Sequence, residues 1–205
     1  MLYGDLVNQV LRALDEFSKK GIPNSTVKTA DYRAKIPDAV NEIQQDLANG
    51  AGRLPKELLI ANVYVPANVL VDVVVALPAD WLKLVGVMIH QDSKYWMPFV
   101  NYRITPTGFV YNSFCSGDIV VTYYRKPTPV AVVDTSSPTV GELAQVIDVI
   151  ADALYIVPTG VAGKVLAIDS PAGSSELLNY YEARKYALNP GRPVRGIETI
   201  VDVYN

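Results

Sequence analysis

Residues 158–165, PTGVAGKV, come nearest in this sequence to a phosphate-binding loop. Such a loop follows the pattern G-x-x-x-x-G-K-[ST], in which backbone amides surround a phosphate and a hydroxyl binds magnesium. Here only two residues separate Gly160 from Gly163, and Val165 stands where the hydroxyl is required. We therefore interpret the segment as a break in a helix that is followed by a surface lysine.

Other residues that could carry catalysis are sparse. The chain has one histidine, His90, and one cysteine, Cys115, so an intrachain disulfide is excluded. His90 has no second ligand at metal-binding spacing, and it is the only imidazole base available to Ser113, Ser116 or Cys115. From these residues we expect no catalytic site, no cofactor and no metal, and therefore no enzyme activity.

Some polar residues allow two interpretations. Asp148 and Asp152 lie four residues apart in a segment with helical pattern, where they could share a cation or simply form a solvated face. Thirteen tyrosines suit partly buried interfaces as well as a core. Arg125-Lys126 and the pair Arg192/Arg195 are small basic spots that can contact phosphate or protect a sheet edge from aggregation.

The overall composition favours association with other chains. Hydrophobic residues make up 50% of the 205 residues and charged residues 19%, whereas about 25% charged is typical of soluble domains. No run approaches the roughly 18 apolar residues of a membrane span. The net charge of −3 argues against a general DNA-binding surface, although not against a channel that DNA passes through. Oligomerisation is the simplest use of the apolar excess.

Two helices are expected before residue 50. Apolar residues at helical spacing predict a helix over 4–20, with a stripe of Leu6, Val7, Val10, Leu11, Leu14 and Phe17. A second helix is expected over 30–49, with a stripe of Ile36, Val40, Ile43 and Leu47. Pro37 either kinks this helix or restarts it at Asp38.

The middle of the chain, from about residue 60 to 127, has the pattern of β-strands. The expected strands cover 62–65, 69–77, 84–90, 95–100, 109–111 and 118–125. No helical segment separates them, which favours an antiparallel meander or a small sandwich over βαβ units. The strand at 118–125 has apolar side chains on both faces and is expected to be covered on both.

The last third returns to helical pattern. A helix is expected over 141–169, broken or bent near Pro158, and another over 174–188, with a serine cap and an acid in its first turn. Residues 191–205 alternate as an extended arm would. The predicted class is α+β: a helical bundle from the N- and C-terminal segments with an inserted antiparallel β block, residues 1–190 forming one domain that precedes the extended C-terminal arm.

Two segments give the chain a family resemblance. Residues 77–82, Leu-Pro-Ala-Asp-Trp-Leu, enter the β block, and residues 123–127, Tyr-Tyr-Arg-Lys-Pro, lead back into the helical part. In this order, after a leading helical segment and before a long helix, the chain resembles the head–tail adaptor, or connector, proteins of tailed bacteriophages. The resemblance covers roughly residues 3–190.

The resemblance implies a structural virion protein. Such adaptors form a homo-oligomeric ring, usually a dodecamer, beneath the portal protein at the head–tail junction, or neck, and carry the next tail or neck protein. DNA crosses the lumen only as passing cargo, during packaging and ejection. The protein would be made in the host cytoplasm, would become part of the virion and would contact no membrane.

The terminal arm is the expected partner interface. Its alternating pattern suits addition of a strand to the sheet edge of another chain, and in this family the arm often reaches the portal or a neighbouring subunit. The residues expected to make the contact are Ile197, Ile200, Val201, Val203 and Tyr204, with Arg192 and Arg195 nearby. Two alternatives stay open: another connector component, such as a stopper or tail-completion protein, and a small oligomeric enzyme.

Overall fold

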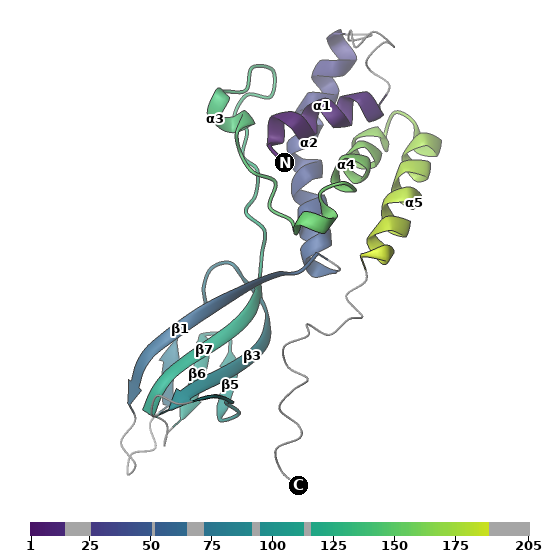
Figure 1. Cartoon of the computed structure of the whole chain (residues 1–205). Helices are drawn as coiled ribbons and strands as arrows, with labels where there is room; N and C mark the ends of the chain where they lie inside the picture. The colour runs from purple at the N-terminus through teal and green to yellow at the C-terminus, as the bar shows by residue number, and fades with distance from the viewer. Residues whose placement is uncertain (15–25, 51, 65–71, 92–94, 113–115, 189–205) are drawn as a thin grey trace. The chain divides into compact units, whose positions relative to one another are not determined.

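A computed structural model describes residues 1–14, 26–50, 52–64, 72–91, 95–112 and 116–188. The described chain combines helices with antiparallel sheets and belongs to the α+β class, as predicted. It divides into two compact units (Figure 1). Residues Leu54–Lys126 form a β unit, and the flanking segments on either side of it form a helical unit.

The helical unit is built from both ends of the chain. Its elements are α1 (Tyr3–Ala13), α2 (Thr26–Asn49), the single turn α3 (Val140–Leu143), a 3-10 turn η1 (Ala151–Ala153), α4 (Val157–Leu166) and α5 (Pro171–Ala187). Helix α4 packs against α1, α2 and α5, and Figure 1 shows it between α2 and α5.

The predicted apolar stripes of the first two helices are confirmed. All described members of both stripes are buried: Leu6, Val7, Val10, Leu11 and Leu14 in and just after α1, and Ile36, Val40, Ile43 and Leu47 in α2. They form one apolar cluster with Val157, Val161 and Val165 of α4. Phe17 and the predicted end of the first helix, residues 15–20, lie outside the described residues.

The predicted helix over 141–169 is wrong. Only α3 and α4 are α-helical there, and an irregular stretch and η1 lie between them. After α3, Val146 forms a β-bridge with Leu2, and the backbone N–H of Tyr3 donates to the carbonyl of Gln145 at 2.8 Å. Backbone groups that a continuous helix would use internally are thus bonded to the start of the chain, so tertiary pairing overrides the local pattern.

The prolines of the helical unit begin or interrupt helices differently from the prediction. Pro158 lies in the first turn of α4 and begins that helix instead of breaking one, because its missing N–H is not needed there. Pro171 begins α5 in the same way, three residues before the predicted start, and the first turn contains no acid. Ser170 precedes α5 without a side-chain capping bond. Helix α2 begins at Thr26 and continues through Pro37.

The β unit contains two antiparallel sheets. Its strands are β1 (Leu54–Tyr64), β2 (Asp72–Val75), β3 (Trp81–Gln91), β4 (Tyr95–Pro98), β5 (Tyr102–Thr105), β6 (Gly108–Asn112) and β7 (Ser116–Arg125). The four-stranded sheet has the order β1-β7-β3-β4, and the three-stranded sheet has the order β2-β6-β5. Strand β1 begins eight residues before the strand expected over 62–65, and its edge position tolerates Pro55.

Apolar residues of both sheets form a single cluster, so the β unit is a small antiparallel sandwich. The cluster combines Ile119 and Val121 of β7 with Val87 and Ile89 of β3 and Phe109 of β6. On one face of β7, Ile119, Val121 and Tyr123 are buried, whereas Val120, Thr122 and Tyr124 on the other face are only half-buried. The expectation that both faces of this strand are covered is therefore met on one face only.

Candidate assembly surface

The residues predicted to contact a partner lie outside the described part of the chain. These are Arg192, Arg195, Ile197, Ile200, Val201, Val203 and Tyr204, all within 189–205. The surfaces that can be argued from geometry are therefore those of the two folded units.

The segment that comes nearest to a phosphate loop is part of the helical core. A Cβ atom on Gly160 would lie 2.8 Å from the Tyr181 ring and 2.9 Å from the Ile43 side chain, and one on Gly163 would lie 2.8 Å from Leu178. Both glycines are buried within α4, where they let this helix approach α2 and α5 closely. Lys164 pairs with Glu42 at 3.0 Å. These residues pack helices together instead of surrounding a phosphate.

Among the described residues, the other candidate chemical residues are not gathered into a site. The His90 ring packs against Trp96 with centroids 4.9 Å apart, and Ser113 and Cys115 lie outside the described residues. Asp148 and Asp152 do not share an α-helix, because Asp148 is in the irregular stretch and accepts the backbone N–H of Thr128 at 2.6 Å. Among the described residues, no group of three or more His, Cys, Asp or Glu is placed to hold a metal ion.

The two segments that carry the family resemblance meet at one corner of the β unit. The rings of Trp81 and Tyr123 stack with centroids 4.8 Å apart, and the Tyr123 hydroxyl donates to the Asp80 carboxylate at 3.0 Å. The backbone N–H of Lys126 donates to the Asp80 carbonyl at 2.7 Å. Residues more than forty positions apart in sequence thus form one structural unit.

Charge complementarity strengthens this corner. The Lys56 ammonium of β1 lies 2.7 Å from the Asp80 carboxylate. The Lys56 ammonium and the Tyr123 hydroxyl hold the pKa of Asp80 below its ordinary value, while burial, followed by the hydrogen bond to Asp80, raises the pKa of Tyr123. Asp80 therefore ties three strands together at the corner where the chain enters and leaves the β unit.

Residues 128–148, here called the strap, form an ordered connection with little regular secondary structure. The Asn41 side chain accepts the Val130 N–H at 2.8 Å and donates to the Val130 carbonyl at 3.0 Å. Gln145 bonds both backbone groups of Ala131 in the same way, at 3.0 and 2.7 Å. Gln44, which is buried, accepts the Asp148 N–H at 2.6 Å. Side chains thus replace the backbone partners that a helix or sheet would supply.

Glu142 organises the tip of the strap. Its carboxylate accepts the backbone N–H groups of Val133 at 2.6 Å and Thr139 at 2.7 Å, and the Thr139 hydroxyl at 2.8 Å. The Thr139 hydroxyl in turn accepts the Glu142 N–H, which completes a capping box for α3. The bond from Val133, followed by those from Thr139, holds the pKa of Glu142 below its ordinary value.

The strap holds apolar side chains outward. Val133 is 97% exposed and Val140 is 85% exposed, and Val146 is also largely exposed. Exposed valines on an irregular connection are common when the connection is loose, but here hydrogen bonds fix the backbone on both sides of them. The strap is therefore a candidate for a surface that another chain covers, which requires that its exposed apolar side chains act together as a patch.

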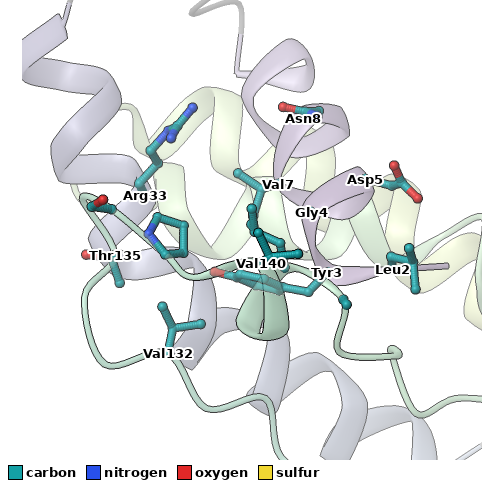
Figure 2. A pocket seen from close by; sticks show the side chains of 14 residues that line it. Leu2, Tyr3, Gly4, Asp5, Val7, Asn8, Arg33, Val132, Thr135 and Val140 are labelled. Atoms are coloured by element: carbon teal, nitrogen blue, oxygen red, sulfur yellow. The ribbon is translucent and has the colours of Figure 1, made fainter.

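A groove separates the strap from the start of α1 (Figure 2). It has a volume of about 600 Å³ and is lined mainly by apolar side chains, among them Leu2, Val7, Val132, Pro138, Val140 and Leu143. In the view of Figure 2, Arg33 and Thr135 lie at one end, whereas Leu2 and Asp5 lie at the other. Burial raises the pKa of Tyr3 in the groove to about 12, so its hydroxyl remains a donor at neutral pH.

The β unit has an exposed apolar surface of its own. Strand β4 is an edge strand, and Tyr95, Trp96 and Met97 on it are all exposed, Tyr95 to 76%. Val100, just beyond this strand, is exposed as well. Aromatic residues and methionine on an edge strand are the residue types that protein interfaces favour.

The comparisons with known proteins do not add a family. No protein-family model matches the chain, and no curated protein sequence matches it significantly. In the part of the chain that the structure describes, no helix has both the length and the apolar character needed to span a bilayer.

Sequence reasoning missed most of the strap. The pair Thr139 and Glu142 has the capping-box spacing, which was a usable signal for α3. No comparable sequence pattern marks the other anchors of the strap, Asn41, Gln44 and Gln145. Each of them bonds backbone groups that are at least 14 positions away in sequence. The groove and Arg33 were missed for the same reason.

Proposed function

We propose that this chain is a structural subunit of a homo-oligomeric ring that joins the portal vertex of a tailed-phage head to the tail. Its N- and C-terminal helices would act as one bundle, with the β unit as an insertion and residues 191–205 as an arm. Assembly is supported chiefly by one observation: a hydrogen-bonded strap that presents Val133 and Val140 to solvent. The phage-specific part of the proposal rests on the resemblance of residues 77–82 and 123–127.

The corner around Asp80 gives that resemblance a physical reason. The acid, the tryptophan and the tyrosine that carry it contact one another, and they fix the point where the chain enters and leaves the β unit. A family that keeps this insertion in place needs such residue types at these positions. The Asp80 corner thus supports the proposed insertion of the β unit, and the role of the chain at the neck is proposed from the resemblance.

The charge of the chain is compatible with a DNA channel. At a net charge of −3, the chain repels a polyanion on average, so DNA can move through a ring without long-lived contacts. In this proposal the partners are further copies, the portal protein and the next tail or neck protein, and no cofactor takes part. The arm, through Ile197, Ile200, Val201, Val203 and Tyr204, would reach one of these partners.

The direct test measures the mass and shape of the particles that the full-length protein forms. Mass photometry and negative-stain images would be recorded for the protein alone and after mixing with a portal protein encoded beside it. We expect closed rings in at least the mixture. A monomer that never joins the portal, or a particle that binds only below an already assembled ring, would contradict the adaptor role; the second result would favour a stopper.

Substitutions in the strap test whether this segment takes part in assembly. Val140→Asp places a charge at the first position of α3, where an acid is tolerated by the helix dipole, so the fold should persist while assembly weakens. Val140→Ala is the matched control and should assemble normally. Deleting residues 192–205 tests the arm separately: unchanged rings and unchanged portal binding would exclude the arm contact.

A further inference from the structure

One donor atom of a cationic side chain in the helical unit lacks a hydrogen-bond acceptor among the described residues. The Nε–H of Arg33 is buried and makes no hydrogen bond among the described residues. A buried donor without an acceptor costs on the order of 1–3 kcal/mol. Arg33 also lines the groove between the strap and α1, so an acceptor that entered the groove would meet the guanidinium group.

The other charges around the groove define where an anion would be favoured. Asp5 lines the groove as well, but Figure 2 shows it at the end away from Arg33. Arg33 and Glu142 act on the pKa of Tyr3 with opposite signs, and the effect of the Arg33 charge is the larger of the two. The Arg33 end is therefore the positive end, and the Tyr3 hydroxyl is a second donor in the groove.

The groove therefore fits a peptide that places a carboxylate next to aliphatic side chains. Its walls are mainly apolar, and its volume of about 600 Å³ lies within the roughly 300–1,000 Å³ of typical ligand sites. A phosphate or a free metabolite would use Arg33 but would leave Leu2, Val132 and Val140 uncovered. A short extended peptide can bond Arg33 through a carboxylate and cover the apolar walls with its aliphatic side chains.

The C-terminal segment of this chain has that chemistry. Residues 200–203 read Ile-Val-Asp-Val, so in an extended conformation the two valines would point to one side and Asp202 to the other. The two valines could thus pack on the apolar wall of the groove while Asp202 bonds the Arg33 guanidinium group. Residues 197–205 contain two acids, Glu198 and Asp202, and no cation to compete for Arg33.

We propose that the groove between the strap and α1 receives residues 200–203 of a second copy of this chain, with the Asp202 carboxylate bonded to Arg33. The choice of a second copy rests on the proposed homo-oligomer. The site deepens that proposal by naming the surface that receives the arm.

Cysteine cross-linking of the full-length protein tests the contact. In a Cys115→Ser background, which removes the only native cysteine, Val140→Cys and Val203→Cys are made as separate variants that carry different mass tags. Because a disulfide needs Cα atoms within about 7 Å, mild oxidation of the mixture should give a mixed dimer only if the arm lies in the groove of another copy.

A matched control comes from the same strap. Val133 is even more exposed than Val140 but does not line the groove, so Val133→Cys should cross-link to Val203→Cys about ten-fold less efficiently. Arg33→Gln should reduce the Val140 cross-link roughly ten-fold, the loss expected for a hydrogen-bonded charge. Asp202→Arg combined with Arg33→Glu should restore it. Far-UV circular dichroism of each variant checks that the fold is retained.

The outcomes separate this inference from the proposed function. Rings that form without the Val140 cross-link overturn the groove contact and leave the adaptor role standing. A specific cross-link in a protein that never binds a portal supports the groove contact and counts against the adaptor role. If a chain that carries both Val140→Cys and Val203→Cys closes its disulfide only within itself, the assignment to a second copy is overturned. A cross-link whose yield does not change with the Arg33 and Asp202 substitutions overturns the charge pairing.

Discussion

Helix α4 and the strap belong to the same helical unit but are held in opposite ways. Most of α4 is buried, including its two glycines and its valines. In the strap, Val130 and Ile147 are buried in the apolar cluster and α2 side chains such as Gln44 bond the backbone, while Val133 and Val140 are exposed. The first segment is stabilised by close apolar packing, whereas the second combines two buried apolar side chains with side-chain hydrogen bonds to its backbone.

This difference means that the residues that keep the helical unit folded are not the ones that are exposed to a partner. Close packing at α4 leaves little tolerance for added atoms, because the neighbours in contact with Gly160 are themselves buried. The strap does not need its exposed valines, Val133 and Val140, to stay folded, since side chains such as Asn41 and Gln145 fix its backbone. A surface built in this way can vary its exposed side chains to suit a partner without loss of the fold.

The largest expected effect is at α4. Gly160→Ala should lower the free energy of unfolding by about 2–3 kcal/mol, because its methyl group would lie under 3.0 Å from both Tyr181 and Ile43. Urea denaturation followed by circular dichroism measures the change.

The matched control is a glycine of the strap. At Gly141 the nearest atom to an added Cβ is the Thr139 hydroxyl oxygen, 4.0 Å away, so Gly141→Ala should be neutral or stabilising by about 0.5 kcal/mol. Equal destabilisation by the two variants would show that the contrast between α4 and the strap is wrong.

The sequence predicted best those elements whose partners are set by local periodicity. The apolar stripes of α1 and α2 repeat at helical spacing, and their described residues are buried as expected. The β block was recognisable from β-branched runs and from turns such as Pro106-Thr107-Gly108, which joins β5 to β6. In these elements, local preference and tertiary packing favour the same structure.

The prediction failed where distant residues decide the backbone. Leu143, Val146, Ile147 and Leu154 have helical spacing, but pairing with residues 1–3 draws this stretch out of a helix. The anchor between Asn41 and Val130 spans 89 positions, and no local pattern indicates it. The same applies to the groove, because its walls come from α1, α2 and the strap, and only the fold brings Arg33 to it.

A loss of stability of intermediate size is expected when the side chain that bonds the strap at Val130 is removed. Asn41→Ala leaves both backbone groups of the buried residue Val130 without their partner, which should cost about 1–2 kcal/mol. Amide hydrogen exchange at Val130 should accelerate more than exchange in α4, because the strap opens before the core. Asn49→Ala makes the same chemical change near the exposed end of α2, where Asn49 bonds only Gln45, and should leave Val130 exchange unaltered.

The smallest effect is a pH dependence that distinguishes the strap from α4. The Val133 and Thr139 bonds lower the pKa of Glu142 below its ordinary value of 4.5, so the carboxylate stabilises the folded strap above that pH. The contribution should be lost as the pH falls through the lower, folded-state pKa, and Asp134, whose pKa the Ser136 hydroxyl lowers, should act in the same direction. Amide exchange at Val133 and Thr139, corrected for its intrinsic pH dependence, should therefore rise relative to exchange in α4 on acidification.

Glu142→Gln isolates this carboxylate. The amide keeps one acceptor oxygen but cannot titrate, so the variant should show weaker protection at neutral pH and a flatter acid profile at Val133. Exchange in α4, which contains no acid, should not respond to the substitution. If the Glu142→Gln variant gave the same acid profile as the native protein, the carboxylate would not be what orders the tip, and the strap would owe its shape to the paired backbone bonds of Gln145 and Asn41 alone.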